Sequence, residues 1–195
     1  MLRRVFVLVL SILLAVSVSA CGKADDSGEG KSETAATDVQ KWEKDLFVRC
    51  FLPEADIADE FLKIMVGLVE TEDSASLRDL FSENTVASCE NMDDSIVELV
   101  DFWQGDMVSC ERYGPMSHTE KEGEAYYKEI CASYDVVTSS GSYRLAFKLC
   151  IVDTEVPENL GLHSVYIIKA EDSDMQFAYW GGGIWNDGIV IEGAE

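Results

Sequence analysis

The hydrophobic period of the chain changes once, near Gly105, and this change constrains the fold more than any other feature. Before Gly105, apolar residues recur every three or four positions, which predicts amphipathic helices. After it, apolar and polar residues alternate, which is typical of strands with one buried face. Helices followed by a run of strands predict an α+β domain, with the N-terminal helices packed on one face of an antiparallel sheet.

Three helices are predicted in the first half. The first begins after Pro53, a residue that suits a helix N-terminus, and the second is capped by Asp73 or the serine after it. The third starts in the acidic segment 90–94, where carboxylates favour the positive end of the helix dipole, and should end near Gly105. An earlier helix over residues 39–51 is also expected.

Two alternating segments, 126–136 and 143–151, predict a β-hairpin. Their apolar positions are even-numbered in the first and odd-numbered in the second, so opposed residues must add to an odd number. A two-residue turn at 140–141 satisfies this rule and places Cys131 opposite Cys150. Opposed residues are close enough for a disulfide, so we predict this pair, with two free thiols as the alternative.

Further strands and the domain boundaries follow from composition. Strands are expected at 107–113, 162–170, 175–181 and after the Asp-Gly turn signal at 186–188. Residues 21–38 hold small, polar and charged residues without large apolar ones, which predicts a flexible acidic tether. Residues 39–195 have the size of one domain with one core.

Residues 1–20 have the form of a bacterial lipoprotein signal peptide. A basic start at 3–4 precedes an apolar run too short to span a bilayer comfortably, and small residues at 18–20 precede Cys21, as in a lipobox. We therefore expect a diacylglycerol on Cys21, palmitate among its acyl chains, and a lipid-anchored position on the extracytoplasmic face of the cell membrane. An uncleaved anchor is the alternative, but residues 22–26 lack the basic flank of a stop-transfer segment.

The charge balance limits the partners of this chain. It has 37 acidic and 15 basic residues and a formal net charge of −22. Nucleic acid is excluded as a partner because phosphate binding needs clustered basic residues. No metal site is predicted, because no two cysteines have the CxxC spacing and the two histidines are far apart. No cofactor motif is present either.

Three segments carry a resemblance to a known family. Tyr-Arg-Leu-Ala-Phe at 143–147, Val-Tyr-Ile-Ile-Lys-Ala at 165–170 and Tyr-Trp-Gly-Gly-Gly at 179–183 resemble uncharacterised lipoproteins of Gram-positive, mainly gut-dwelling, bacteria. The likeness covers about residues 55–191. It implies a cone-shaped fold similar to the nuclear-transport-factor-like superfamily, in which helices and a curved antiparallel sheet enclose a pocket. That superfamily holds both enzymes and binding domains, so the resemblance implies no catalytic residue.

Four residues are candidates for lining such a pocket: Asp153, Tyr179, Trp180 and Trp185. The aromatic residues flank three glycines and would supply stacking walls for a ligand; the alternative is a bulged strand packed on the helices. Asp153 continues an apolar alternation, so burial would raise its pKa; the alternative is a polar cap at a strand end.

These observations predict a membrane-anchored extracytoplasmic lipoprotein that serves as a non-catalytic ligand-binding or accessory module. Its partner would be a small molecule or an envelope protein. One alternative is an isomerase- or dehydratase-like enzyme that uses Asp153 or a histidine, although His118 is expected in an exposed loop and His163 at a strand end. The other is a protein-interaction module that acts through an exposed sheet face.

Overall fold

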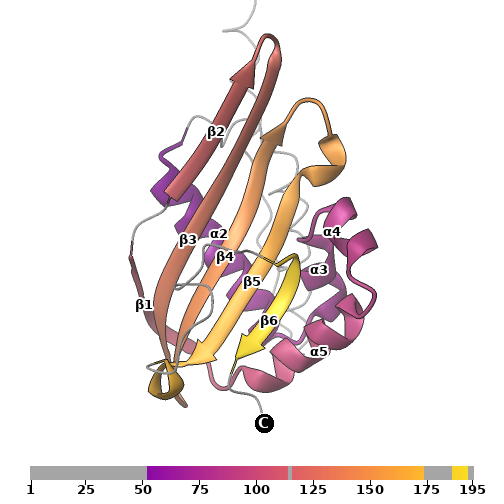
Figure 1. The fold of residues 1–195 in the computed structure, drawn as a ribbon. Helices are drawn as coiled ribbons and strands as arrows, with labels where there is room; N and C mark the ends of the chain where they lie inside the picture. Colours follow the sequence, from indigo (N-terminus) through magenta and orange to yellow (C-terminus); the bar gives the residue numbers. More distant parts are fainter. Residues whose placement is uncertain (1–51, 114–115, 174–185, 193–195) are drawn as a thin grey trace, which may run out of the picture.

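The computed structural model describes residues 52–113, 116–173 and 186–192 (Figure 1). The helices are α2 (Glu54–Glu70), α3 (Ser74–Asp79), α4 (Glu83–Ser88) and α5 (Met92–Phe102). The strands are β1 (Met107–Arg112), β2 (Met116–Glu122), β3 (Ala125–Thr138), β4 (Ser142–Asp153), β5 (Gly161–Lys169) and β6 (Gly188–Glu192). The short 3-10 segments are η1 (Pro157–Asn159) and η2 (Ala170–Asp172). This arrangement confirms the α+β class.

The three helices predicted within the described residues are confirmed, and their starts have local causes. Helix α2 begins directly after Pro53, and Asp73 caps α3 by accepting a hydrogen bond from Ser76 N at 3.1 Å. Helix α4 was not predicted. It also has a side-chain cap, because Ser82 Oγ accepts from Thr85 N at 3.1 Å. The helix expected over residues 39–51 lies outside the described residues.

The strands form one six-stranded sheet in the order β1, β3, β4, β5, β6, with β2 also paired to β3. Strands β1 to β5 pair antiparallel, as predicted. Strand β6 pairs parallel with β5, so the prediction of a wholly antiparallel sheet is wrong at this edge. Strand β2 was missed because residues 117–122 are polar and exposed on both faces. The strand expected at 175–181 lies outside the described residues.

The hairpin of β3 and β4 has the predicted parity but not the predicted register. Cys131 lies opposite Lys148, and Cys150 lies opposite Glu129, so the expected opposition of the two cysteines is wrong. The turn is longer than predicted because Thr138 Oγ1 accepts hydrogen bonds from two backbone N–H groups within it. The pairs therefore shift by two residues, and both cysteines are free thiols in this structure.

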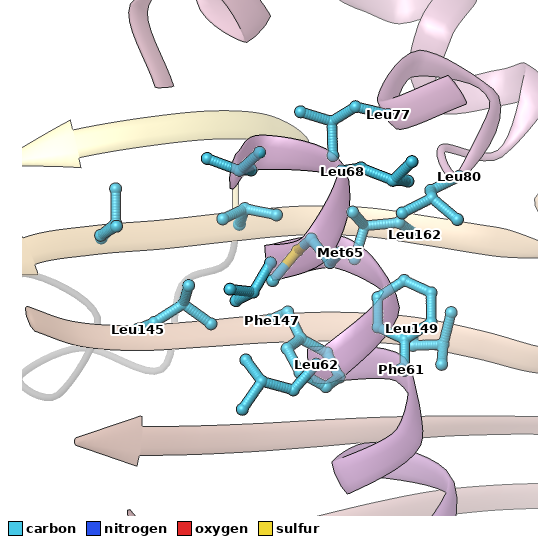
Figure 2. Packing of buried hydrophobic residues seen from close by; sticks show 14 of the residues in the cluster. Phe61, Leu62, Met65, Leu68, Leu77, Leu80, Leu145, Phe147, Leu149 and Leu162 are labelled. Atoms are coloured by element: carbon cyan, nitrogen blue, oxygen red, sulfur yellow. The ribbon is translucent and has the colours of Figure 1, made fainter. Parts of the chain in front are cut away.

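The main core lies between α2 and one face of the sheet (Figure 2). Phe61 on α2 meets Phe147 on β4 with ring centroids 5.1 Å apart, and Tyr134 on β3 stacks on the same ring at 6.0 Å. Leu62, Met65 and Leu149 surround these rings with almost no exposed surface. The space between α2 and these strands is therefore filled by side chains.

An ion pair fixes α2 on the edge of the sheet. Arg112 on β1 pairs with Asp59 on α2 and donates to Ala55 O at 3.0 Å. Tyr134 on β3 donates to Asp59 Oδ1 at 2.9 Å. Burial alone would raise the pKa of Asp59, but the hydrogen bonds from Arg112 and Tyr134 hold it below its usual value.

The second face of the sheet is also shielded from solvent along β4 and β5. Ala146, Tyr166 and Ile168 are buried there. Asn186, just before β6, accepts a hydrogen bond from Ser164 Oγ at 2.6 Å and donates one to Tyr166 Oη at 2.6 Å. These three buried side chains are therefore not part of an exposed sheet face.

Candidate ligand-binding cleft

A cleft of about 450 Å³ opens at the end of the sheet where three elements of the chain meet. These segments are the loop after α5, the turn between β3 and β4, and the end of β5 with η2, at the lower end of the sheet in Figure 1. The described residues that line it are Gln104, Ser140, Gly141, Ser142, Tyr143, Lys169, Ala170 and Glu171. Most of these side chains are polar or charged.

The wall formed by the β3–β4 turn is held to the loop after α5 by hydrogen bonds. Thr138 Oγ1 donates to Gln104 O at 2.6 Å, and Ser139 N donates to Asp106 O at 2.9 Å. Asp106 N donates in return to Ser139 Oγ at 3.1 Å. Gly105 has a φ of 79°, and a Cβ there would lie 2.5 Å from Ser139 Oγ. Glycine is therefore needed for this close approach.

Aromatic side chains support the cleft from below. Trp103 stacks on Tyr143 with ring centroids 5.0 Å apart, and Phe102 meets Tyr143 edge-on at 5.7 Å. Tyr143 Oη accepts a hydrogen bond from Gln104 N at 3.0 Å and donates to Phe102 O at 3.3 Å. These contacts fix the last turn of α5 against β4 beside the cleft.

The cleft contains two opposite charges. Lys169 lies opposite Tyr143 in the sheet register, and its Nζ lies 5.8 Å from the centroid of the Phe102 ring. This position is near the C-terminal end of α5, where the helix dipole favours a cation. Glu171 follows in η2. Neither Lys169 nor Glu171 forms an ion pair with another described residue.

Asp153 lies at the other end of β4 from the cleft and caps a turn. Its Oδ1 accepts from Glu155 N at 3.0 Å and Val156 N at 2.9 Å, and its Oδ2 accepts from Asn159 Nδ2 at 2.8 Å. Burial alone would raise the pKa of Asp153, but these hydrogen bonds hold it below its usual value. The structure therefore has the strand-end cap rather than an acid with a raised pKa.

The other predicted pocket residues, Tyr179, Trp180 and Trp185, and the lipidation site Cys21 lie outside the described residues. The two histidines do not line the cleft. His118 lies on the exposed strand β2 rather than in a loop, with Nε2 2.7 Å from Glu120 Oε1.

His163 lies near the start of β5, as predicted, with its Nε2 2.6 Å from Asn159 O. This hydrogen bond orients the ring toward the η1 turn that Asp153 also caps. The imidazole of His163 and the carboxylate of Asp153 therefore both hydrogen-bond to Asn159 in this turn.

A second polar cluster lies on the second face of the sheet, between β3 and β4. Glu129 is almost fully buried, pairs with Lys148 Nζ at 3.0 Å and accepts a hydrogen bond from Tyr127 Oη. Burial raises the pKa of Cys131 to about 11 and that of Cys150 to about 12, with Glu129 adding to both shifts. Both thiols are therefore protonated near neutral pH, which makes them poor nucleophiles.

The cleft residues were not identified from sequence. Only the turn signal at 139–141 marks part of the site, because the other lining residues come from segments without a shared motif or spacing. Among the described residues, no group of three or more His, Cys, Asp or Glu side chains is placed to hold a metal ion. No helix within these ranges is both long and apolar enough to cross a membrane.

Comparison with known protein families shows which family the chain belongs to. Residues 64–170 match the family described as "Domain of unknown function (DUF5104)", and the chain belongs to this family. Of the lining residues that the structure describes, the matched range contains all but Glu171. No curated protein matches the chain significantly.

Proposed function

We propose that this protein is a lipid-anchored extracytoplasmic binding module that holds a small polar molecule in the cleft at the end of the sheet. The observation that carries this proposal is the cleft itself. Its volume of about 450 Å³ lies within the range of ordinary ligand sites. Its walls are fixed by hydrogen bonds and aromatic stacking, so little ordering would be needed when a ligand binds.

The anchor in this proposal is a diacylglycerol on Cys21. Residues 22–38 of the tether would reach about 55–60 Å if fully extended, which would let the domain stand away from the bilayer. The resemblance to Gram-positive lipoproteins supports a place on the outer face of the cell membrane. Helix α2, which lies across one face of the sheet, is compatible with a cone-shaped, nuclear-transport-factor-like version of the fold.

The titratable groups support binding over catalysis. Asp153 is the carboxylate expected to act as an acid or base. It accepts hydrogen bonds from the backbone of the turn after β4, and its pKa is lowered. The thiols of Cys131 and Cys150 have raised pKa values and lie away from the cleft. General acid or base catalysis requires a group whose pKa is near the working pH and which reaches the substrate. None of these three groups meets both conditions.

The test of binding is native mass spectrometry of the full-length lipoprotein, released from membranes in detergent and exposed to a culture extract of its own organism. A reproducible small-molecule adduct supports the proposal. A protein that acquires no small molecule but captures a polypeptide would contradict it and favour an envelope interaction module.

The anchor is tested separately by metabolic labelling with radioactive palmitate. The wild-type protein should incorporate the label and fractionate with membranes, because the lipobox thiol is the acceptor. A Cys21→Ser variant should do neither. Equal labelling of both proteins would show that Cys21 is not the lipidated residue.

A further inference from the structure

The two charges in the cleft indicate the class of ligand. We infer that the cleft takes a small zwitterion that carries one carboxylate and one ammonium group, as a free amino acid does. Lys169 would bind the carboxylate and Glu171 the ammonium group. This inference rests on the proposed function, and it names the chemistry of the same site.

Lys169 is well placed to bind a carboxylate. Its main chain is fixed at the end of β5 by pairing with Tyr143, and its ammonium group lies near the Phe102 ring. The side chain is half-buried and lines the cleft, yet it has no carboxylate partner among the described residues. An ammonium group that has lost part of its water gains a charge-assisted hydrogen bond when a carboxylate binds.

Glu171 supplies the opposite charge two residues further along the chain. It is exposed at the rim in η2 and lines the same cleft. Ser140, Ser142 and Gln104 add hydroxyl and amide groups, which can donate or accept hydrogen bonds from either end of a ligand.

The charge of the whole molecule favours a ligand without net charge. With a formal net charge of −22, the protein repels small anions, so Lys169 alone would make a weak anion site. A simple cation would meet Lys169 inside the cleft. A zwitterion avoids both penalties because it has no net charge and places each of its groups beside the opposite charge.

The test is isothermal titration calorimetry on the full-length lipoprotein in detergent. The probes are L-alanine, L-leucine and L-glutamine, each compared with its amide, which lacks the carboxylate, and its N-acetyl form, which lacks the ammonium group. At least one free amino acid should bind. Its amide and its N-acetyl form should each bind about tenfold more weakly, since each loses one charged hydrogen bond.

Two variants assign the charges. Lys169→Met should weaken the free amino acid about tenfold and remove the preference over the amide, while the preference over the N-acetyl form remains. Glu171→Gln should also weaken the free amino acid about tenfold, but it should remove the preference over the N-acetyl form and keep the preference over the amide.

Lys121→Met is the matched control, because Lys121 is exposed on β2 and does not line the cleft. Its binding should equal that of the wild type. Circular dichroism checks that each variant is folded.

Two outcomes would overturn the inference. One is that no probe binds the wild-type protein; the other is that folded Lys169→Met and Glu171→Gln keep the preferences of the wild type. The proposed function is judged apart from this, by capture from the extract. A captured small molecule with failed probes rejects only the zwitterion, whereas capture of a polypeptide alone rejects both.

Discussion

At the scale of single residues, Asp153 is the clearest case of a carboxylate whose role is structural. Because its pKa is lower in the folded protein than in the unfolded chain, its contribution to stability is present at neutral pH. That contribution is lost as the pH falls from about 4 toward the folded pKa.

Replacing Asp153 by Asn should therefore lower the free energy of unfolding by about 1 kcal/mol at pH 7, through weaker acceptance from the turn N–H groups. At acidic pH the two proteins should differ less, because the wild-type carboxyl loses its charge as the pH falls through its lowered folded pKa. Urea unfolding at both pH values measures this, with Glu155→Gln as the exposed control. An equal loss at both pH values would show that the carboxylate charge is unimportant.

The sequence could not decide between the two roles of Asp153. The alternation along β4 predicts which positions are apolar, but it does not say how the chain turns after the strand. The deciding groups are the backbone N–H groups of residues 155 and 156 and the amide of Asn159, which come together only when η1 forms.

At the scale of elements, Gly161 controls how the helices join the sheet. The link between α3 and α4 pairs with the start of β5, since Ser82 N donates to Leu162 O at 3.0 Å and Leu162 N to Leu80 O at 2.8 Å. Gly161 has a φ of 120°, and a Cβ there would lie 2.9 Å from Leu80 O. Any other residue would push this link away from β5.

We expect Gly161→Ala to lower the free energy of unfolding by about 1–3 kcal/mol, because it combines backbone strain with this clash. Gly67→Ala is the matched comparison. A Cβ at Gly67 in α2 has no atom within 4 Å, so alanine should raise the free energy of unfolding by about 0.5–1 kcal/mol. Denaturant unfolding measures both variants, and effects of the same sign would contradict this account.

The register of β3 and β4 shows which part of strand pairing can be predicted from a sequence pattern. The parity of the pairing follows from the apolar faces, because a slip by one residue would expose the core side chains. A slip by two residues keeps the same faces, so the pattern cannot detect it. The choice is made by Thr138, whose hydroxyl oxygen accepts from the N–H groups of Ser140 and Gly141 and lengthens the turn.

At the scale of the whole molecule, Phe147 connects the helical layer to the sheet. Its ring contacts Phe61 from α2 and Tyr134 from β3, and it is fully buried. Phe147→Ala should therefore lower the free energy of unfolding by about 3–5 kcal/mol. Val137→Ala, at an exposed position on β3, should change it by less than about 0.5 kcal/mol.

Denaturant unfolding monitored by circular dichroism compares the two variants. A loss below 1 kcal/mol at Phe147, or equal losses at both positions, would contradict a core centred on this ring.

The architecture could be predicted because the period of the apolar residues differs between helices and strands along the chain. The cleft could not be predicted, because its described lining residues lie in three segments separated by more than twenty positions each. Their proximity depends on the strand order and on contacts such as the stacking of Trp103 on Tyr143. The parallel pairing of β6 is likewise set by tertiary packing, and no local turn signal indicates it.

If the cleft is the ligand site, a large side chain that fills it should abolish binding. Gly141 lines the cleft, and a Cβ there has no atom within 4 Å, so Gly141→Trp can place a large ring in the site. Val137→Trp is the control in the same hairpin, at an exposed residue outside the lining.

The measurement is native mass spectrometry of the two full-length variants after exposure to the culture extract. We predict that Gly141→Trp loses the small-molecule adduct while Val137→Trp keeps it. An adduct retained by a folded Gly141→Trp protein at the wild-type occupancy would show that the ligand binds elsewhere.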